Sequence, residues 1–160
     1  MNRQNTEITV PTGDGNISSL RFHGYASEFA KYAREAEAGQ GRQFSPVTYY
    51  LYCHSLELVL KAFLLAKSVP MAELPTPGLR HDLEKILQRA KGLGLEQTVP
   101  LAAHWEPEVH KANAYYNNKE FEYFDLDNAG RGYPNLPALD VLNEMVTRFL
   151  ADLKQVCDEA

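Results

Sequence analysis

Apolar residues recur along most of this chain at spacings of three and four, which is the period of an amphipathic helix. The longest such stripe lies near the C-terminus, and the helix that carries it is predicted to begin at Pro137 or Ala138. All its members fall on one face, so this helix is expected to pack through that face. The stripe consists of Leu139, Leu142, Met145, Val146, Phe149, Leu153 and Val156.

End signals and the same period predict two helices in the first half of the chain. The first begins near Ser18 or Ser19, because serine caps helix N-termini well, and glycines at 39 and 41 end it. The second follows Ser45-Pro46, a cap and a proline at the first helical position, and covers about 47–67. It is apolar on nearly every side, so we expect it to be the central and most buried helix.

Two more helices are predicted ahead of the C-terminal one. The third carries apolar residues on one face between Leu83 and Ala90, and glycines at 92 and 94 end it. The fourth carries a stripe over 101–116, and Pro107 within it either bends the helix or marks its start. Residues 117–137 combine aromatic residues with glycine and proline and are predicted to form a long loop.

Five amphipathic helices and almost no strand signal predict an all-α fold, an antiparallel bundle of about five helices. A chain of 160 residues can bury a core without metals or disulfides, so a single helical domain is expected over residues 18–158. The preceding residues 1–17 are polar and contain a cluster of turn formers at 11–16. They are expected to form a flexible arm, or a short strand at 7–10.

The charge of the chain narrows the set of partners. A net charge of −5 repels phosphate backbones at long range, which argues against broad, non-specific binding of nucleic acid but leaves room for a local basic pocket. The longest apolar stretch, 56–66, is interrupted by Glu57 and Lys61 and is too short to span a bilayer. No membrane partner is therefore expected.

The cysteines and histidines do not indicate a metal or redox site. Cys53 and Cys157 form no CxxC pair, which fits a reducing cytoplasm, and residues 1–10 do not resemble a signal peptide. His104 and His110 are six residues apart, a poor spacing for two ligands on one helical face. No metal or cofactor is expected, and the chain lacks a serine elbow, a P-loop, a dinucleotide fingerprint and an HExxH motif.

Three polar groups interrupt the apolar second helix: His54, Glu57 and Lys61. Their spacings of three and four place them on one face. One interpretation is a solvated strip in which Glu57 and Lys61 form an ordinary i,i+4 pair. The other is a strip that faces a cleft or a partner subunit, because unpaired buried charge is costly.

The third helix is preceded by Arg80 and His81 and then Asp82. Either His81 or Asp82 could cap the helix, and an acidic residue is favourable there. Alternatively, Arg80 and His81 could reach a phosphate, since a helix N-terminus attracts anions.

The long loop supplies the last candidates. Aromatic and amide side chains crowd residues 115–124, including Tyr116, and Arg131 and Tyr133 follow. Such residues could form a surface on which a base stacks. They could equally be packed beneath the loop, and the sequence leaves both interpretations open.

Three segments, taken together, resemble the HEPN superfamily, named for higher eukaryotes and prokaryotes nucleotide-binding. Residues 50–64 resemble its apolar second helix, with a glutamate and, four residues on, a lysine. Residues 81–87 resemble its histidine-acidic-leucine helix start, and residues 131–134 its arginine-tyrosine-proline segment with Gly132 inserted. The resemblance covers about residues 18–153 and implies a small helical domain that binds nucleotides.

One feature of that family is missing. Its RNA-cutting members resemble one another in an arginine followed, after four to six residues, by a histidine. No arginine of this chain has a histidine at that spacing, and Arg131, at the usual place, is followed by none. The resemblance therefore implies a binding or partner module rather than an enzyme.

The sequence thus predicts a non-catalytic, HEPN-like module that binds a nucleotide or an RNA end. A place in a toxin–antitoxin or defence system, beside a nucleotidyltransferase-type partner, is a further interpretation. The alternative is a diverged, metal-independent ribonuclease that uses His54, Glu57 and Lys61, or Arg80 and His81, as acid, base and phosphate clamp. A homodimer is expected, because the last and second helices offer more faces than one small bundle needs.

Overall fold

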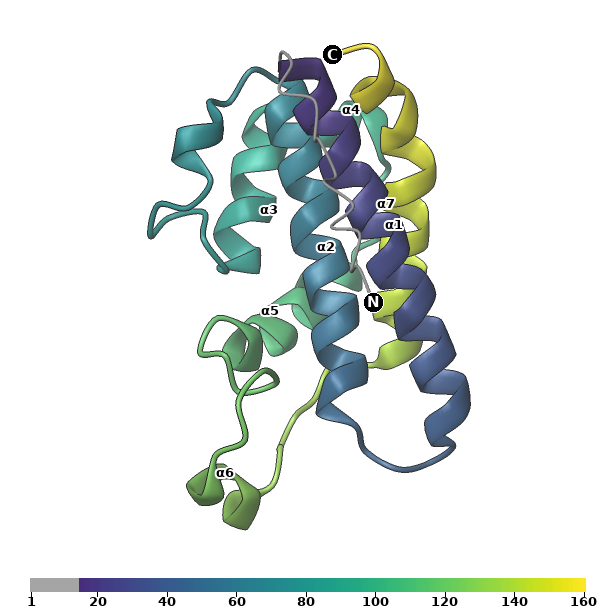
Figure 1. Ribbon diagram of the computed structural model, residues 1–160, viewed down its shortest axis with the longest axis vertical. Helices are drawn as coiled ribbons and strands as arrows, with labels where there is room; N and C mark the ends of the chain where they lie inside the picture. Colours follow the sequence, from purple (N-terminus) through teal and green to yellow (C-terminus); the bar gives the residue numbers. More distant parts are fainter. Residues whose placement is uncertain (1–14) are drawn as a thin grey trace, which may run out of the picture.

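The computed structural model describes residues 15–160, and every regular element within them is helical (Figure 1). The predicted all-α class is confirmed, whereas the arm or strand predicted at the N-terminus falls mostly on residues 1–14, outside the described residues. The three longest helices are α1 (Gly15–Gln40), α2 (Pro46–Ala66) and α7 (Leu139–Asp158). The shorter elements are η1 (Met71–Glu73), α3 (Leu83–Gly92), α4 (Leu95–Thr98), α5 (Trp105–Tyr116) and α6 (Leu126–Arg131).

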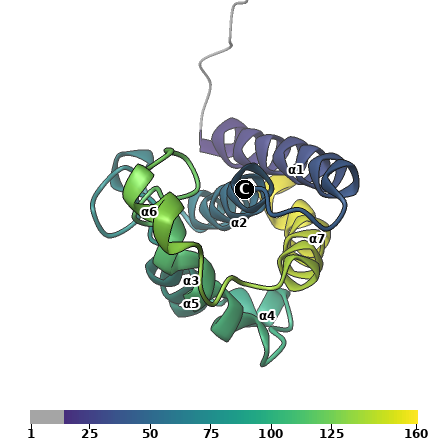
Figure 2. The same ribbon diagram turned by 90° about the horizontal axis from the view of Figure 1, so that it is seen from below.

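The helix α2 is the centre of the bundle, as its apolar sequence predicts. It packs against α1, α7, α3 and α5, and the end-on view shows it between α1 and α3 (Figure 2). Tyr52, Leu56, Leu60 and Phe63 are completely buried along it. Within residues 15–160, no helix has both the length and the apolarity needed to cross a bilayer.

The apolar stripe of α7 is used inside the bundle. Leu142, Val146, Phe149 and Leu153 are fully buried, and α7 packs on both α1 and α2. The side chain of Arg34 on α1 ties the two helices at the surface by donating to Asn143 Oδ1 at 2.9 Å. The stripe therefore gives no reason to expect a second copy on that face, and the homodimer stays a prediction.

Two helix boundaries differ from those predicted. The first helix begins at Gly15, a few residues before Ser18. The predicted fourth helix is α5, which begins at Trp105 after Leu101, so the interpretation that Pro107 marks the start of this helix is confirmed. Pro107 then lies in the first turn, where its missing N–H breaks no helical hydrogen bond, so α5 has no need to bend.

Two short helices lie where only chain reversals or loop were expected. The helices α4 and α6 contain four and six residues, too few to show a helical period in the sequence. The chain enters α4 through Gly94, whose φ of 90° is a left-handed conformation that glycine adopts without strain. Leu95, fully buried, anchors α4 to the core.

Truncating the core of α2 should destabilise the whole bundle. We expect Leu60→Ala to lower the free energy of unfolding by about 2–5 kcal/mol, because the cavity left behind adds to the lost burial. Leu20→Ala on the outer face of α1, where the side chain is 43% exposed, is the matched control and should cost well under half as much. Urea unfolding followed by circular dichroism measures both, and equal losses would contradict the central position of α2.

Candidate functional site

The carboxylate of Glu57 lies at the centre of a polar cluster inside the bundle. Its side chain is 3% exposed, and that of Lys61, one turn further along α2, is 8% exposed. The predicted i,i+4 pair is present, with Lys61 Nζ 2.5 Å from Glu57 Oε1. The interpretation of this pair as a solvated strip is wrong, because α5 and the segment before α3 cover it.

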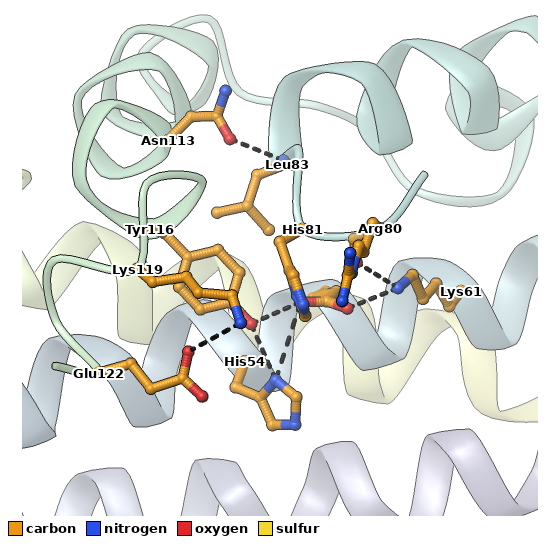
Figure 3. A network of polar contacts seen from close by, with 10 residues as sticks. His54, Lys61, Arg80, His81, Leu83, Asn113, Tyr116, Lys119 and Glu122 are labelled. Carbon is orange, nitrogen blue, oxygen red and sulfur yellow. Dashed lines mark hydrogen bonds and ion pairs between the residues drawn. The ribbon is translucent and has the colours of Figure 1, made fainter. Parts of the chain in front are cut away.

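Three further side chains converge on this carboxylate, His54 from the same helix and His81 and Tyr116 from other parts of the chain, and Figure 3 labels all three. Tyr116, at the end of α5, donates its hydroxyl proton to Glu57 Oε2 at 2.5 Å, and His81 Nδ1 lies 3.1 Å from the same oxygen. His54 Nδ1 lies 2.8 Å from the Tyr116 hydroxyl and 3.8 Å from Glu57 Oε2. We refer to His54, Glu57, Lys61, His81 and Tyr116 as the Glu57 cluster.

The cluster fixes which nitrogen of each histidine carries a proton. The hydroxyl of Tyr116 has one proton, which points at Glu57, so its oxygen accepts from His54 Nδ1–H. An ionised carboxylate only accepts, so His81 also has its proton on Nδ1. When neutral, both imidazoles therefore carry their unprotonated nitrogen, Nε2, on the side away from these bonds.

The protonation states of Glu57 and Tyr116 are stable over the physiological pH range. Burial alone would raise the pKa of Glu57, but His54, the Lys61 ammonium and the Tyr116 hydroxyl outweigh it and lower this pKa to about 2. Burial and the neighbouring carboxylate raise the pKa of Tyr116 far above its ordinary value. Glu57 thus stays ionised and Tyr116 stays protonated, so neither is suited to act as a general acid or base near neutral pH.

The turn that leads into α3 holds Arg80 and His81 in place. Lys61 Nζ donates to the carbonyl oxygen of Arg80 at 2.6 Å. Asp82 caps α3, as one of the two predicted capping choices, and accepts from the backbone N–H of Lys85 at 3.1 Å. The N-terminus of α3 is thus occupied by its own side chains, which argues against phosphate binding at the helix end itself.

Asn113 of α5 completes this turn, and the sequence analysis missed it. Its Oδ1 accepts from the backbone N–H of Leu83 at 2.8 Å, and its Nδ2 donates to Asp82 Oδ1 at 3.1 Å and to Glu84 Oε2 at 3.0 Å. The available signal was the position of Asn113 among the apolar residues of the predicted fourth helix, because an amide buried there needs hydrogen-bond partners. It connects α5 to the start of α3.

A cavity of about 360 Å³ opens beside the cluster. Arg80 at its rim is exposed, and its side chain has no ion pair with any part of the chain that the structure describes. On the opposite side of His81, a depression of only about 20 Å³ has room for little more than a water molecule. The larger cavity is lined by Lys61, Arg80 and His81 together with Phe22, Met71, Leu74 and Pro75.

The two remaining candidates do not join the cluster. Tyr133 packs against the rings of Phe44, Tyr115 and Phe121, with centroids 4.6, 5.5 and 6.2 Å away. This tyrosine is thus packed beneath the loop rather than offered to a base. Arg131 is exposed at the end of α6, which projects away from the bundle (Figure 1).

Other concave or acidic regions are less suited to ligand chemistry. A groove of about 660 Å³ lies between Trp105 and the exposed side of α7. Its charges are already paired, Arg148 with Asp152 at 2.6 Å and Glu144 with His104 at 3.2 Å. Among residues 15–160, no group of three or more histidine, cysteine or acidic side chains could hold a metal ion.

Comparison of this chain with protein-family models, with curated proteins and with solved structures finds no match.

Removing the buried charge of Glu57 should destabilise the protein strongly. Glu57→Gln keeps the shape of the side chain but leaves the Lys61 ammonium buried without its counter-ion, and we expect a loss of about 3–5 kcal/mol at neutral pH. Glu73→Gln, at an exposed glutamate, should change the free energy of unfolding by less than about 0.5 kcal/mol.

This loss should depend on pH in a defined direction. The folded pKa of Glu57 lies below its ordinary value of 4.5, so its contribution is complete above that value and is lost as the pH falls toward 2. Urea unfolding of wild type and Glu57→Gln between pH 7 and pH 2 should therefore show their difference shrinking below about pH 4.5. A difference that stays constant or grows in acid would refute this assignment.

Proposed function

We propose that this chain is a non-catalytic, HEPN-like binding module that takes the phosphate of a nucleotide or an RNA end in the cavity beside Arg80. The observation that carries the proposal is an exposed guanidinium at the mouth of a partly apolar cavity, next to a histidine held by the buried Glu57. The resemblance of residues 50–64 and 81–87 to that superfamily supports it independently.

The cavity has the composition that such a ligand needs. Its volume of about 360 Å³ falls within the range of small-molecule sites. Phe22, Met71 and Leu74 provide an apolar wall for a base or a ribose, and Arg80 presents planar donors that suit phosphate oxygens. Because Glu57 neutralises Lys61, Arg80 is the cation that a bound phosphate would meet.

The binding interpretation is preferred because the cluster offers few groups for acid–base chemistry. Cleavage of RNA without a metal needs one group to take the 2′-hydroxyl proton and another to protonate the leaving oxygen. Lys61 is buried and bonded to Glu57 and to the Arg80 carbonyl. His54 is bonded to Tyr116, and its ring lies between Phe29 and Tyr50, with centroids 4.5 and 5.4 Å away. Of the two histidines, only His81 lines the cavity.

One observation favours the alternative, a metal-independent ribonuclease. A carboxylate that holds the Nδ1–H of a histidine orients the imidazole and fixes its tautomer, and Glu57 holds His81 in this way. With Arg80 as the phosphate clamp, His81 would be the general base. A role beside a nucleotidyltransferase-type protein, in a toxin–antitoxin or defence system, rests on the family resemblance alone.

Ligand binding should raise the melting temperature of the protein and should depend on Arg80. Nucleoside monophosphates and a 5′-phosphorylated oligoribonucleotide are the probes, with inorganic phosphate as the control for phosphate alone. At about a hundredfold excess over Kd, a bound probe stabilises the folded state by about 2.7 kcal/mol, which is several degrees in Tm.

We expect Arg80→Ala to weaken this binding by about 10- to 100-fold, since hydrogen bonds to charged groups contribute about 1.5–3 kcal/mol. Arg89→Ala, which removes another exposed positive charge from the surface, this one on α3, should leave the affinity unchanged. Calorimetric titration compares the three proteins. Binding that is absent, or that both variants weaken equally, would reject the proposed cavity.

Purified protein should not cut RNA above background. Wild type and a His54→Ala, His81→Ala double variant should leave an end-labelled oligoribonucleotide equally intact in the presence of EDTA. Equal, slow cleavage by both would indicate a contaminant. Cleavage by wild type that the double variant and Arg80→Ala both lose would establish the ribonuclease instead.

A further inference from the structure

The segment of residues 122–127 exposes large apolar side chains that the candidate site does not use. Tyr123, Phe124 and Leu126 are 61%, 84% and 79% exposed, more than any other large apolar side chain that the structure describes. They lie at α6, which projects from the body of the bundle (Figure 1). Scattered exposed apolar residues are ordinary, but three within four positions mark a surface for binding another molecule.

The base of this segment is held firmly, so the exposed side chains are not simply part of an unpacked loop. Phe121, immediately before it, is buried and stacks on Tyr49 with ring centroids 5.3 Å apart. Tyr115 packs on Phe121 with ring centroids 5.3 Å apart and donates its hydroxyl to the Pro134 carbonyl beyond α6. The chain is therefore tied down on both sides of the projecting residues.

Acidic side chains alternate with the apolar ones. Glu122, Asp125 and Asp127 are exposed in the same six residues. Lys119 lies 3.9 Å from Glu122, a separation at which an exposed pair contributes little. Asp125 Oδ1 accepts from the backbone N–H of Asp127 at 2.9 Å, which leaves its charge uncompensated.

The charge selects among the kinds of partner. Three carboxylates repel the phosphates of nucleic acid and of anionic lipid headgroups. A symmetric contact between two copies of this segment would place like charges opposite each other, which is unfavourable. A basic protein surface suits both the carboxylates and the aromatic rings, because it attracts the former and can bury the latter in apolar pockets.

We propose that residues 122–127 dock onto a basic surface of a partner protein that contains apolar pockets, with Phe124 as the main anchor. Aromatic side chains in desolvated pockets dominate binding energy, and complementary charge raises the rate of encounter. None of these six residues lines the Arg80 cavity, so docking and ligand binding involve different residues.

A photo-crosslinking amino acid at position 124, in cells that naturally make this protein, tests the proposal. We expect an adduct with a single protein whose crosslinked peptide is rich in lysine and arginine. The same amino acid at position 32, where Tyr32 is 53% exposed on α1, is the control and should not give this adduct.

The charge dependence is the decisive measurement. Glu122→Lys with Asp127→Lys should reduce the adduct at least tenfold, and Phe124→Ala should weaken binding of the purified partner by a similar factor. Both variants change exposed side chains, so their melting temperatures should match wild type. An adduct with a second copy, with nucleic acid or with lipid, an adduct that survives charge reversal, or none at all would overturn the proposal.

Discussion

The buried carboxylate of Glu57 is the constraint on which the rest of this structure depends. The charge of a carboxylate that is 3% exposed must be compensated by hydrogen bonds or a counter-ion. Each side chain that donates to it fixes the position of the segment that carries that side chain. The hydrogen bond from Tyr116 holds the end of α5 against α2, and the contact with His81 holds the turn before α3 there. The fold outside the α1–α2–α7 core is thus organised by one charge as well as by apolar burial.

The same charge explains why the exposed face of the site is simple. Lys61 donates hydrogen bonds to Glu57 and to the Arg80 carbonyl, and the Tyr116 hydroxyl is hydrogen-bonded to Glu57 and His54. What remains for an incoming molecule is Arg80, the outer edge of His81 and an apolar wall. Most hydrogen bonds of the ionisable residues in this cluster are thus made to one another and to the turn that carries Arg80 and His81.

The long helices could be predicted because α7 shows the period that burial of one face leaves in a sequence, and because α2 combines a Ser-Pro start signal with an apolar length typical of a buried helix. The Glu57–Lys61 pair and the Asp82 cap were also predictable, since both arise from local spacing. Local spacing carries no information on which distant segment covers a polar strip, so the meeting of Tyr116 and His81 on Glu57 could not be derived. The short helices α4 and α6 are too short to show a period, and α4 is held in place by the burial of Leu95.

The shared carboxylate also restricts how this sequence can change over evolutionary time. A substitution of Glu57 alone leaves the buried ammonium of Lys61 without a counter-ion, and loss of Lys61 alone leaves the buried carboxylate of Glu57 without one. A joint replacement of the two by apolar residues of similar size avoids both penalties, but it removes the support of His81 and Tyr116. The residues at positions 57, 61, 81 and 116 are thus expected to be substituted together during evolution. A homologue should either keep all four or replace all four.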